Sequence, residues 1–194
     1  MGAEVHRGDL ADLTGLRKAA ADADAVIHLA FDHATMSAGD FPGAVATDMA
    51  VVQALGDALA GTGKTLVGVG LTHTGDARRD AAIDANHWPA GHVLDIGRLY
   101  RLVLDKAPAG AQLYGEAEQG ITVREIAETI GRRLDLPAVS IPAEQATGHF
   151  GPFGAIMTMG LPPLSSDATR ELLGWKPEHP GLLADLEEGH YFAR

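Results

Sequence analysis

The 194-residue sequence contains no cysteine, which excludes disulfide bonds, thiolate zinc sites and cysteine nucleophiles. Basic residues are also scarce, with 15 lysines and arginines against 26 aspartates and glutamates, for a formal net charge of −11. A surface of that sign repels a phosphate backbone, so we expect no nucleic-acid partner. No apolar run reaches the roughly 18 residues that a membrane-spanning helix needs. We therefore expect a soluble cytoplasmic protein with no membrane partner.

Short β-forming runs alternate with helical patterns in the first half of the sequence. Residues 24–31, DAVIHLAF, are rich in β-forming side chains and too short for a helix, which favours a buried parallel strand. Residues 44–60 repeat apolar side chains at steps of three and four and predict an amphipathic helix. We also expect strands at 3–10 and 64–70, and a helix that begins at Asp12. This alternation favours an α/β fold with a doubly wound parallel sheet.

The second half of the sequence favours helices. Asp95 is expected to cap one of them, and Thr122 with Glu125 forms the pattern of a capping box at the start of another. Ser165 or Ser166 is expected to cap a third. The predicted helices span 95–107, 122–134, 165–175 and 181–192, and a strand and turn are expected at 111–120.

One stretch resembles a phosphate-binding P-loop in a permissive form. Its residues are Ala58, then four residues, then Gly63, Lys64 and Thr65. A P-loop leaves a strand and opens a helix, whose N-terminus faces the phosphates. Here the order is reversed, because a predicted helix precedes the motif and a predicted strand follows it. An ordinary turn is the better prediction.

Nine histidines raise the question of a metal site. His28 and His33 are five residues apart, as are His87 and His92, and neither spacing places both rings on one helical face. No group of carboxylates accompanies them in the way that metal sites require. The sequence therefore predicts no metal site.

Several segments resemble the extended short-chain dehydrogenase/reductases of the NAD-dependent epimerase/dehydratase type. Residues 5–31 are similar to the third strand, third helix and fourth strand of that family, including its GDL-x-D turn and V-I-H-L-A strand. Residues 92–108, 120–137 and 165–192 are similar to its smaller substrate lobe, in the expected order. The resemblance implies a truncated Rossmann-like domain over 1–90, a mostly helical substrate lobe over 91–194, and NAD or NADP as cofactor.

The resemblance also implies which residues touch the cofactor. Asp9 and Leu10 would meet its adenine, and Leu29, Ala30 and Phe31 would lie beside it at the carboxyl end of a strand. Asp9 also suits an ordinary strand-ending turn, and Leu29 also suits the core. Both alternatives remain open at this point.

The resemblance further implies a catalytic residue and an oligomeric state. Thr72 would stand where the family presents a catalytic serine or threonine hydroxyl. Relatives often pair through the helix that corresponds to 44–60, so a homodimer is expected through that helix.

Two family features are missing from the 194 residues. The Gly-rich phosphate turn is absent, and the Tyr-x-x-x-Lys pair is absent because Tyr100 is followed by Leu104 and Tyr114 by Glu118. We therefore expect a shortened NAD(P)-dependent oxidoreductase or epimerase for a small-molecule substrate, catalytically impaired as this chain stands. The alternative is a non-catalytic binding or interaction protein on the same scaffold.

Overall fold

The computed structural model is mixed α/β, which confirms the fold class in its broad form. The residues described are 4–69, 86–151, 154 and 164–192. The chain divides into two compact units, Met1–Leu71 and Thr72–Arg194. The described strands form two separate pairs, one parallel and one antiparallel. The boundary expected after residue 90 lies later in the chain than this division.

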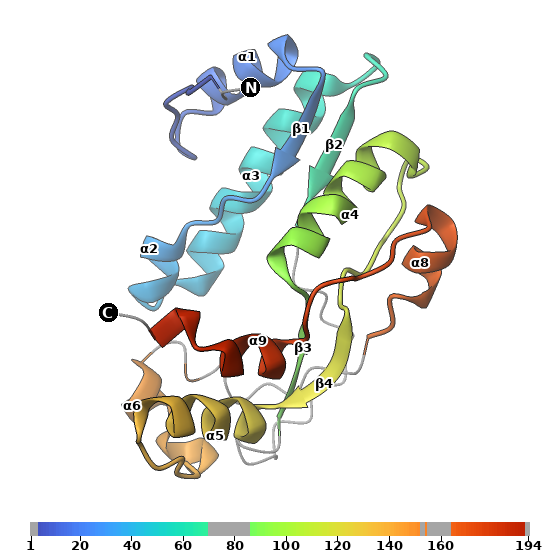
Figure 1. Ribbon diagram of the computed structural model, residues 1–194. Helices are drawn as coiled ribbons and strands as arrows, with labels where there is room; N and C mark the ends of the chain where they lie inside the picture. Colours follow the sequence, from blue (N-terminus) through green and yellow to red (C-terminus); the bar gives the residue numbers. More distant parts are fainter. Residues whose placement is uncertain (1–3, 70–85, 152–153, 155–163, 193–194) are drawn as a thin grey trace. The chain divides into compact units, whose positions relative to one another are not determined.

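A β-α-β arrangement forms the centre of the first unit (Figure 1). Strand β1 (Ala25–His28) pairs in parallel with β2 (Thr65–Gly68), with Val26 opposite Leu66. Helix α3 (Phe41–Leu59) lies between them in the chain. The prediction of neighbouring parallel strands within 24–31 and 64–70 is therefore confirmed.

Aspartates cap the three helices described in this unit. Asp12 caps α1 (Leu13–Asp22), because its Oδ1 accepts a hydrogen bond from the backbone N–H of Gly15 at 2.9 Å. Asp32 caps the short α2 (His33–Ser37), which was not predicted. Asp40 caps α3 by accepting from the N–H of Gly43 at 2.9 Å. Helix α3 therefore begins earlier than predicted.

The core of the first unit is made by α1, α3 and one face of the strand pair. Leu55 and Leu59 of α3 are buried with Val51 and with Ala20 of α1. Val45 and Met49, which belong to the apolar repeat predicted over 44–60, are instead exposed, Met49 by 61%. Helix α3 carries few charged side chains, so its sequence pattern does not fix which apolar face turns inward.

The strand predicted at 3–10 is wrong over its described part. Residues 4–9 adopt no regular structure, and the Val5 side chain is 84% exposed. A strand is stabilised by pairing with a neighbour, and no described strand pairs with this segment. Its β-forming composition alone therefore does not make it a strand.

The turn between α3 and β2 confirms the rejection of the P-loop. Gly61 and Gly63 adopt positive φ angles of 72° and 74° in this turn. Lys64 follows the end of a helix and precedes a strand. Its Nζ donates to the carbonyl oxygen of Ala21 at 2.7 Å, which ties the turn to the end of α1.

An antiparallel strand pair and several helices form the second unit. Strand β3 (His87–Ala90) pairs with β4 (Glu118–Thr122), and this pairing continues through a bond from the N–H of Ala117 to the carbonyl of Ala90. Strand β3 was not predicted. The helices are α4 (Val93–Lys106), α5 (Val123–Leu134), α6 (Ala146–Phe150), α8 (Asp167–Leu173) and α9 (Leu182–Glu188), with 3-10 turns at Ala143–Gln145 and His190–Phe192.

The predicted capping box of α5 is present. Thr122 Oγ1 accepts from the N–H of Glu125 at 3.1 Å, and the Glu125 carboxylate accepts from the N–H of Thr122 at 3.0 Å. For α8 the outcome is mixed. Ser166 holds the cap position, but its Oγ donates to the carbonyl of Glu116, and Ser165 instead accepts from the N–H of Asp167.

The main apolar cluster of the second unit joins α4 to α8 and the segment after it. Leu99, Leu173 and Trp175 are its buried members. The indole N–H of Trp175 donates to the carbonyl of Asp95 at 3.0 Å, so this ring is fixed by both packing and a hydrogen bond.

Among the helices in the described ranges, none has the length and apolar composition needed to cross a membrane.

The buried face of α3 can be tested by a pair of substitutions. We expect Leu55→Ala to lower the free energy of unfolding by about 3 kcal/mol, because it leaves a cavity in the core. Gln53→Ala on the exposed polar side of α3 should change it by less than about 0.5 kcal/mol. Urea denaturation measures both. Equal effects of the two substitutions would contradict this assignment of the faces.

Candidate functional site

The carboxyl end of β1 holds three of the residues that the resemblance assigns to the cofactor. Leu29 and Ala30 are exposed, Leu29 by 62%, so Leu29 does not pack in the core. Phe31 is half-buried, with its ring 5.6 Å from that of His33 and 6.4 Å from that of Phe41. Open α/β sheets bind ligands outside the carboxyl ends of their strands. An accessible apolar segment therefore lies at the appropriate edge.

Asp9 and Leu10 lie in the turn before α1. The Asp9 carboxylate is exposed and accepts from the N–H of Ala11 at 2.8 Å, as expected of a turn residue. The Leu10 side chain packs against the core of the first unit. Thr72, which the resemblance assigns as a catalytic residue, lies outside the described residues.

The sequence raised His28 only as a possible metal ligand and did not predict its burial or its partner at the end of β1. His28 is 8% exposed, and its Nε2 lies 2.9 Å from Oδ1 of Asp48 in α3. Both residues interrupt apolar runs, which is the one sequence signal that could have drawn attention to them. The contact links α3 to the strand end that carries Leu29.

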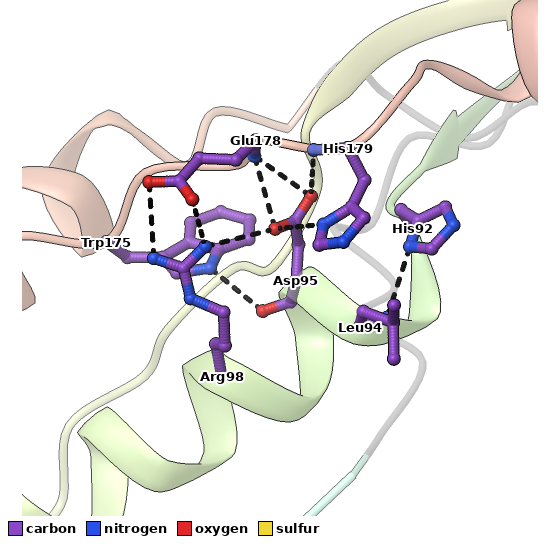
Figure 2. Close-up of polar contacts among 7 residues, drawn as sticks. All are labelled: His92, Leu94, Asp95, Arg98, Trp175, Glu178 and His179. Carbon is purple, nitrogen blue, oxygen red and sulfur yellow. Dashed lines mark hydrogen bonds and ion pairs between the residues drawn. The ribbon is translucent and has the colours of Figure 1, made fainter.

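The second unit contains a denser polar cluster around Asp95 (Figure 2). Asp95 lies in the first turn of α4, and its carboxylate is completely buried. The carboxylate accepts from the backbone N–H groups of Glu178 and His179 at 3.0–3.2 Å. It also accepts from Nδ1 of His179 at 2.9 Å.

These hydrogen bonds determine the charge state of Asp95. Burial on its own would raise the pKa of this carboxyl group. The hydrogen bonds from the His179 ring and from the N–H groups of His179 and Glu178 outweigh burial and lower the pKa of Asp95 from 3.8 to about 2. The carboxylate is therefore ionised at neutral pH.

The cap predicted for α4 is wrong. His92, and not Asp95, holds the cap position, and its Nδ1 accepts from the N–H of Leu94 at 3.2 Å. Asp95 instead turns toward the segment around residues 178–179, because the donors that satisfy its buried charge are there. Only the chain fold brings those donors, more than eighty residues away in sequence, to α4.

Two imidazole rings lie face to face at this cluster. The rings of His92 and His179 have centroids 4.4 Å apart and planes inclined by 7°. On the other side of Asp95, Arg98 donates to the exposed Glu178 carboxylate at 2.8 Å. The cluster thus anchors the 175–179 segment on α4. Nε2 of each histidine takes no part in these hydrogen bonds, which use Nδ1.

A second buried carboxyl group lies elsewhere in this unit. Glu116 is 7% exposed, and its Oε1 has no hydrogen-bond partner within the part of the chain that the structure describes. Burial raises the pKa of Glu116, and nearby Arg170 only partly opposes this shift. The protonated form of Glu116 is therefore favoured more than that of an exposed glutamate.

One group of potential metal ligands occurs near the end of the described chain. Oxygen or nitrogen atoms of Asp185, Glu188 and His190 lie within 4.8 Å of one another. The Tyr191 hydroxyl donates to the Asp185 carboxylate, so part of this group already serves an internal contact. Glu188 and His190 are exposed.

Comparisons with known proteins identify two curated relatives, and both are described as uncharacterized. An uncharacterized protein of Schizosaccharomyces pombe is 44% identical over 107 residues, which cover 55% of this chain and 36% of the relative. An uncharacterized protein of Saccharomyces cerevisiae is 42% identical over 105 residues, which cover 54% of this chain and 35% of the relative. The match spans about a third of the length of these relatives. No family model and no solved structure matches the chain.

The buried charge of Asp95 leads to a test of stability. We expect Asp95→Asn to lower the free energy of unfolding by about 3 kcal/mol, because the buried donors lose a charged acceptor. The exposed Asp105→Asn in the same helix is the control and should change it by less than about 0.5 kcal/mol. Urea denaturation at pH 7 measures both.

The same variant has a pH signature. The folded-state pKa of Asp95 is lowered, so its contribution is complete above the ordinary value of 3.8 and is lost as pH falls toward about 2. Between pH 3.8 and about 2, the free energy of unfolding of the unsubstituted chain should fall more steeply with pH than that of Asp95→Asn. Urea denaturation at several pH values measures both. Parallel acid profiles of the two chains would contradict the assignment.

Proposed function

We propose that this chain is part of an NAD(P)-dependent oxidoreductase or epimerase of the short-chain dehydrogenase/reductase type. The observation that carries the proposal is the exposed apolar segment Leu29–Ala30, which follows β1 at the carboxyl edge of a parallel strand pair. A Rossmann-like fold places its nucleotide at such an edge. The parallel β1–β2 pair and the helix α3 between them are the matching local arrangement.

The residues at this edge fit the planar rings of a dinucleotide better than its pyrophosphate. Exposed Leu29 and half-buried Phe31 offer apolar surface against which a planar adenine or nicotinamide ring can rest. The glycines with positive φ nearest to β2, Gly61 and Gly63, precede that strand and so lie at its amino end. Because the strands are parallel, that end is away from the carboxyl edge. The carboxyl edge of β1 therefore supplies a ring surface, and Gly61 and Gly63 supply no cradle for the pyrophosphate there.

Proton transfer is the second requirement that these 194 residues do not meet. No tyrosine is followed by a lysine at the fourth position, so the pair that exchanges a proton with substrate in the family is absent from this sequence. We therefore propose that the chain as it stands binds a nucleotide weakly and does not turn over substrate. Catalysis would belong to a longer form that carries those parts.

Cofactor binding is tested by titrating the purified chain with NADH. We expect a saturable rise in NADH fluorescence with a dissociation constant on the order of 1 mM, since ring contacts alone hold the ligand. Leu29→Asp should abolish this rise because it places a negative charge beside an anionic ligand.

The control for this experiment is Ala50→Asp. Ala50 is exposed on the polar side of α3, so the substitution adds the same charge away from the β1 edge. It should leave the NADH titration unchanged. No fluorescence change at millimolar NADH, or an equal loss in both variants, would contradict nucleotide binding at this edge.

A second function, an interaction scaffold, is favoured by one specific observation. Helix α3 exposes Phe41, Val45 and Met49 at successive steps of four residues, with exposed fractions of 46%, 37% and 61%. Residues at this spacing share one face of a helix. Contiguous exposed apolar surface marks a contact site in soluble proteins. We propose that this face pairs with its copy in a homodimer.

Dimer formation is tested by sedimentation velocity over a concentration series. Met49→Asp should shift the chain toward the monomer, because it buries an unpaired charge within the proposed contact. Ala50→Asp adds the same charge one position away, on the polar side, and should leave the dimer intact. A monomer at all concentrations in the original chain would reject the proposal.

A further inference from the structure

The stacked histidines His92 and His179 form the most distinctive polar feature that the proposed function does not use. Their rings are 4.4 Å apart and nearly parallel (Figure 2). Both side chains are half-buried, and that of His179 is 32% exposed. Each ring has one nitrogen held by a bond within the protein, which leaves Nε2 to act toward a ligand.

The two internal bonds require opposite tautomers. His179 Nδ1 lies 2.9 Å from the ionised Asp95 carboxylate, which only accepts, so this nitrogen carries the proton. His179 Nε2 in the neutral ring is therefore an acceptor. His92 Nδ1 accepts from the N–H of Leu94, so the proton of this neutral ring is on Nε2. The pair presents one acceptor and one donor.

Both tautomers are fixed by groups that do not exchange roles. A buried carboxylate with lowered pKa remains an acceptor at neutral pH, and a backbone N–H is always a donor. The pair is therefore suited to a neutral ligand that carries both a hydrogen-bond donor and an acceptor.

Apolar surface accompanies this polar pair. Val93 and Leu94 directly follow His92 and are 74% and 57% exposed. Ligand sites combine apolar surface with a few fixed polar groups that orient the ligand. A compound with a hydrocarbon side and two adjacent hydroxyl groups matches both elements.

We propose that His92 and His179 form a binding site for a neutral vicinal diol. One hydroxyl donates to Nε2 of His179, and the other accepts from Nε2–H of His92. The carbon skeleton of the ligand rests on Val93 and Leu94. The site lies within the second unit and does not depend on cofactor binding in the first.

The tautomers are tested first, by NMR of the imidazole nitrogens at pH 8 without any cofactor. Long-range proton–nitrogen correlations distinguish a protonated ring nitrogen from an unprotonated one. We expect the proton on Nδ1 of His179 and on Nε2 of His92. The same tautomer on both rings would overturn the proposal, whatever the outcome of the NADH titration.

Binding is tested with trans-1,2-cyclohexanediol as the probe and its dimethyl ether as the matched control. The diol should shift the ring nitrogens of both histidines in a saturable way, with a dissociation constant on the order of 10 mM for a ligand of so few atoms. The ether cannot donate a hydrogen bond, so its affinity should be lower than that of the diol by at least about fivefold, the effect of one lost hydrogen bond. Equal effects of the two probes, or none, would overturn the site.

A variant pair completes the test. His92→Phe keeps a flat ring for stacking and removes the donor, so the shift of His179 by the diol should weaken by about fivefold. His149→Phe, at an exposed histidine outside the cluster, should leave the titration unchanged. A diol response that is the same in both variants would contradict the site. Should His92→Phe fail to fold, the comparison of diol with ether in the original chain decides the question.

Discussion

The second unit depends on the need to satisfy one buried negative charge. A carboxylate removed from water requires several donors close by, or it takes up a proton. Asp95 obtains them from the backbone and ring of the 178–179 segment, and that segment is thereby held against the first turn of α4. The neighbouring Trp175 indole repeats the link through the carbonyl of the same residue. The tautomer of His179 follows from this attachment, which also places its ring against that of His92.

The first unit depends instead on the apolar character of α3. A 19-residue helix with so few charged side chains stabilises the fold by burying Val51, Leu55 and Leu59 against α1 and the strand pair. It leaves a neighbouring apolar strip of Phe41, Val45 and Met49 in contact with solvent. The proposed dimer contact and the ordered carboxyl edge of β1, joined to α3 through His28 and Asp48, both derive from this helix.

Local signals in the sequence predicted local structure well and predicted the site only in part. Strand β1, the parallel β2, the Asp12 cap and the Thr122 capping box depend on neighbouring residues, and all are confirmed. The strand over residues 4–9 failed because a strand needs a partner. Strand β3, with a proline in its four residues, was missed because its pairing with β4 comes from a distant part of the chain.

The sequence by itself determined the start of α1 at Asp12, the capping box of α5, which runs form the parallel pair, and that Gly63-Lys64 lies in a turn before a strand. These features depend on contacts within a few residues, which a linear pattern contains. Only the tertiary structure decided that Leu29 is exposed, that Asp95 is buried rather than a cap, and that His92 stacks on His179. The physical reason is that burial and long-range hydrogen bonding join segments more than eighty residues apart, and no periodicity in the sequence records that pairing.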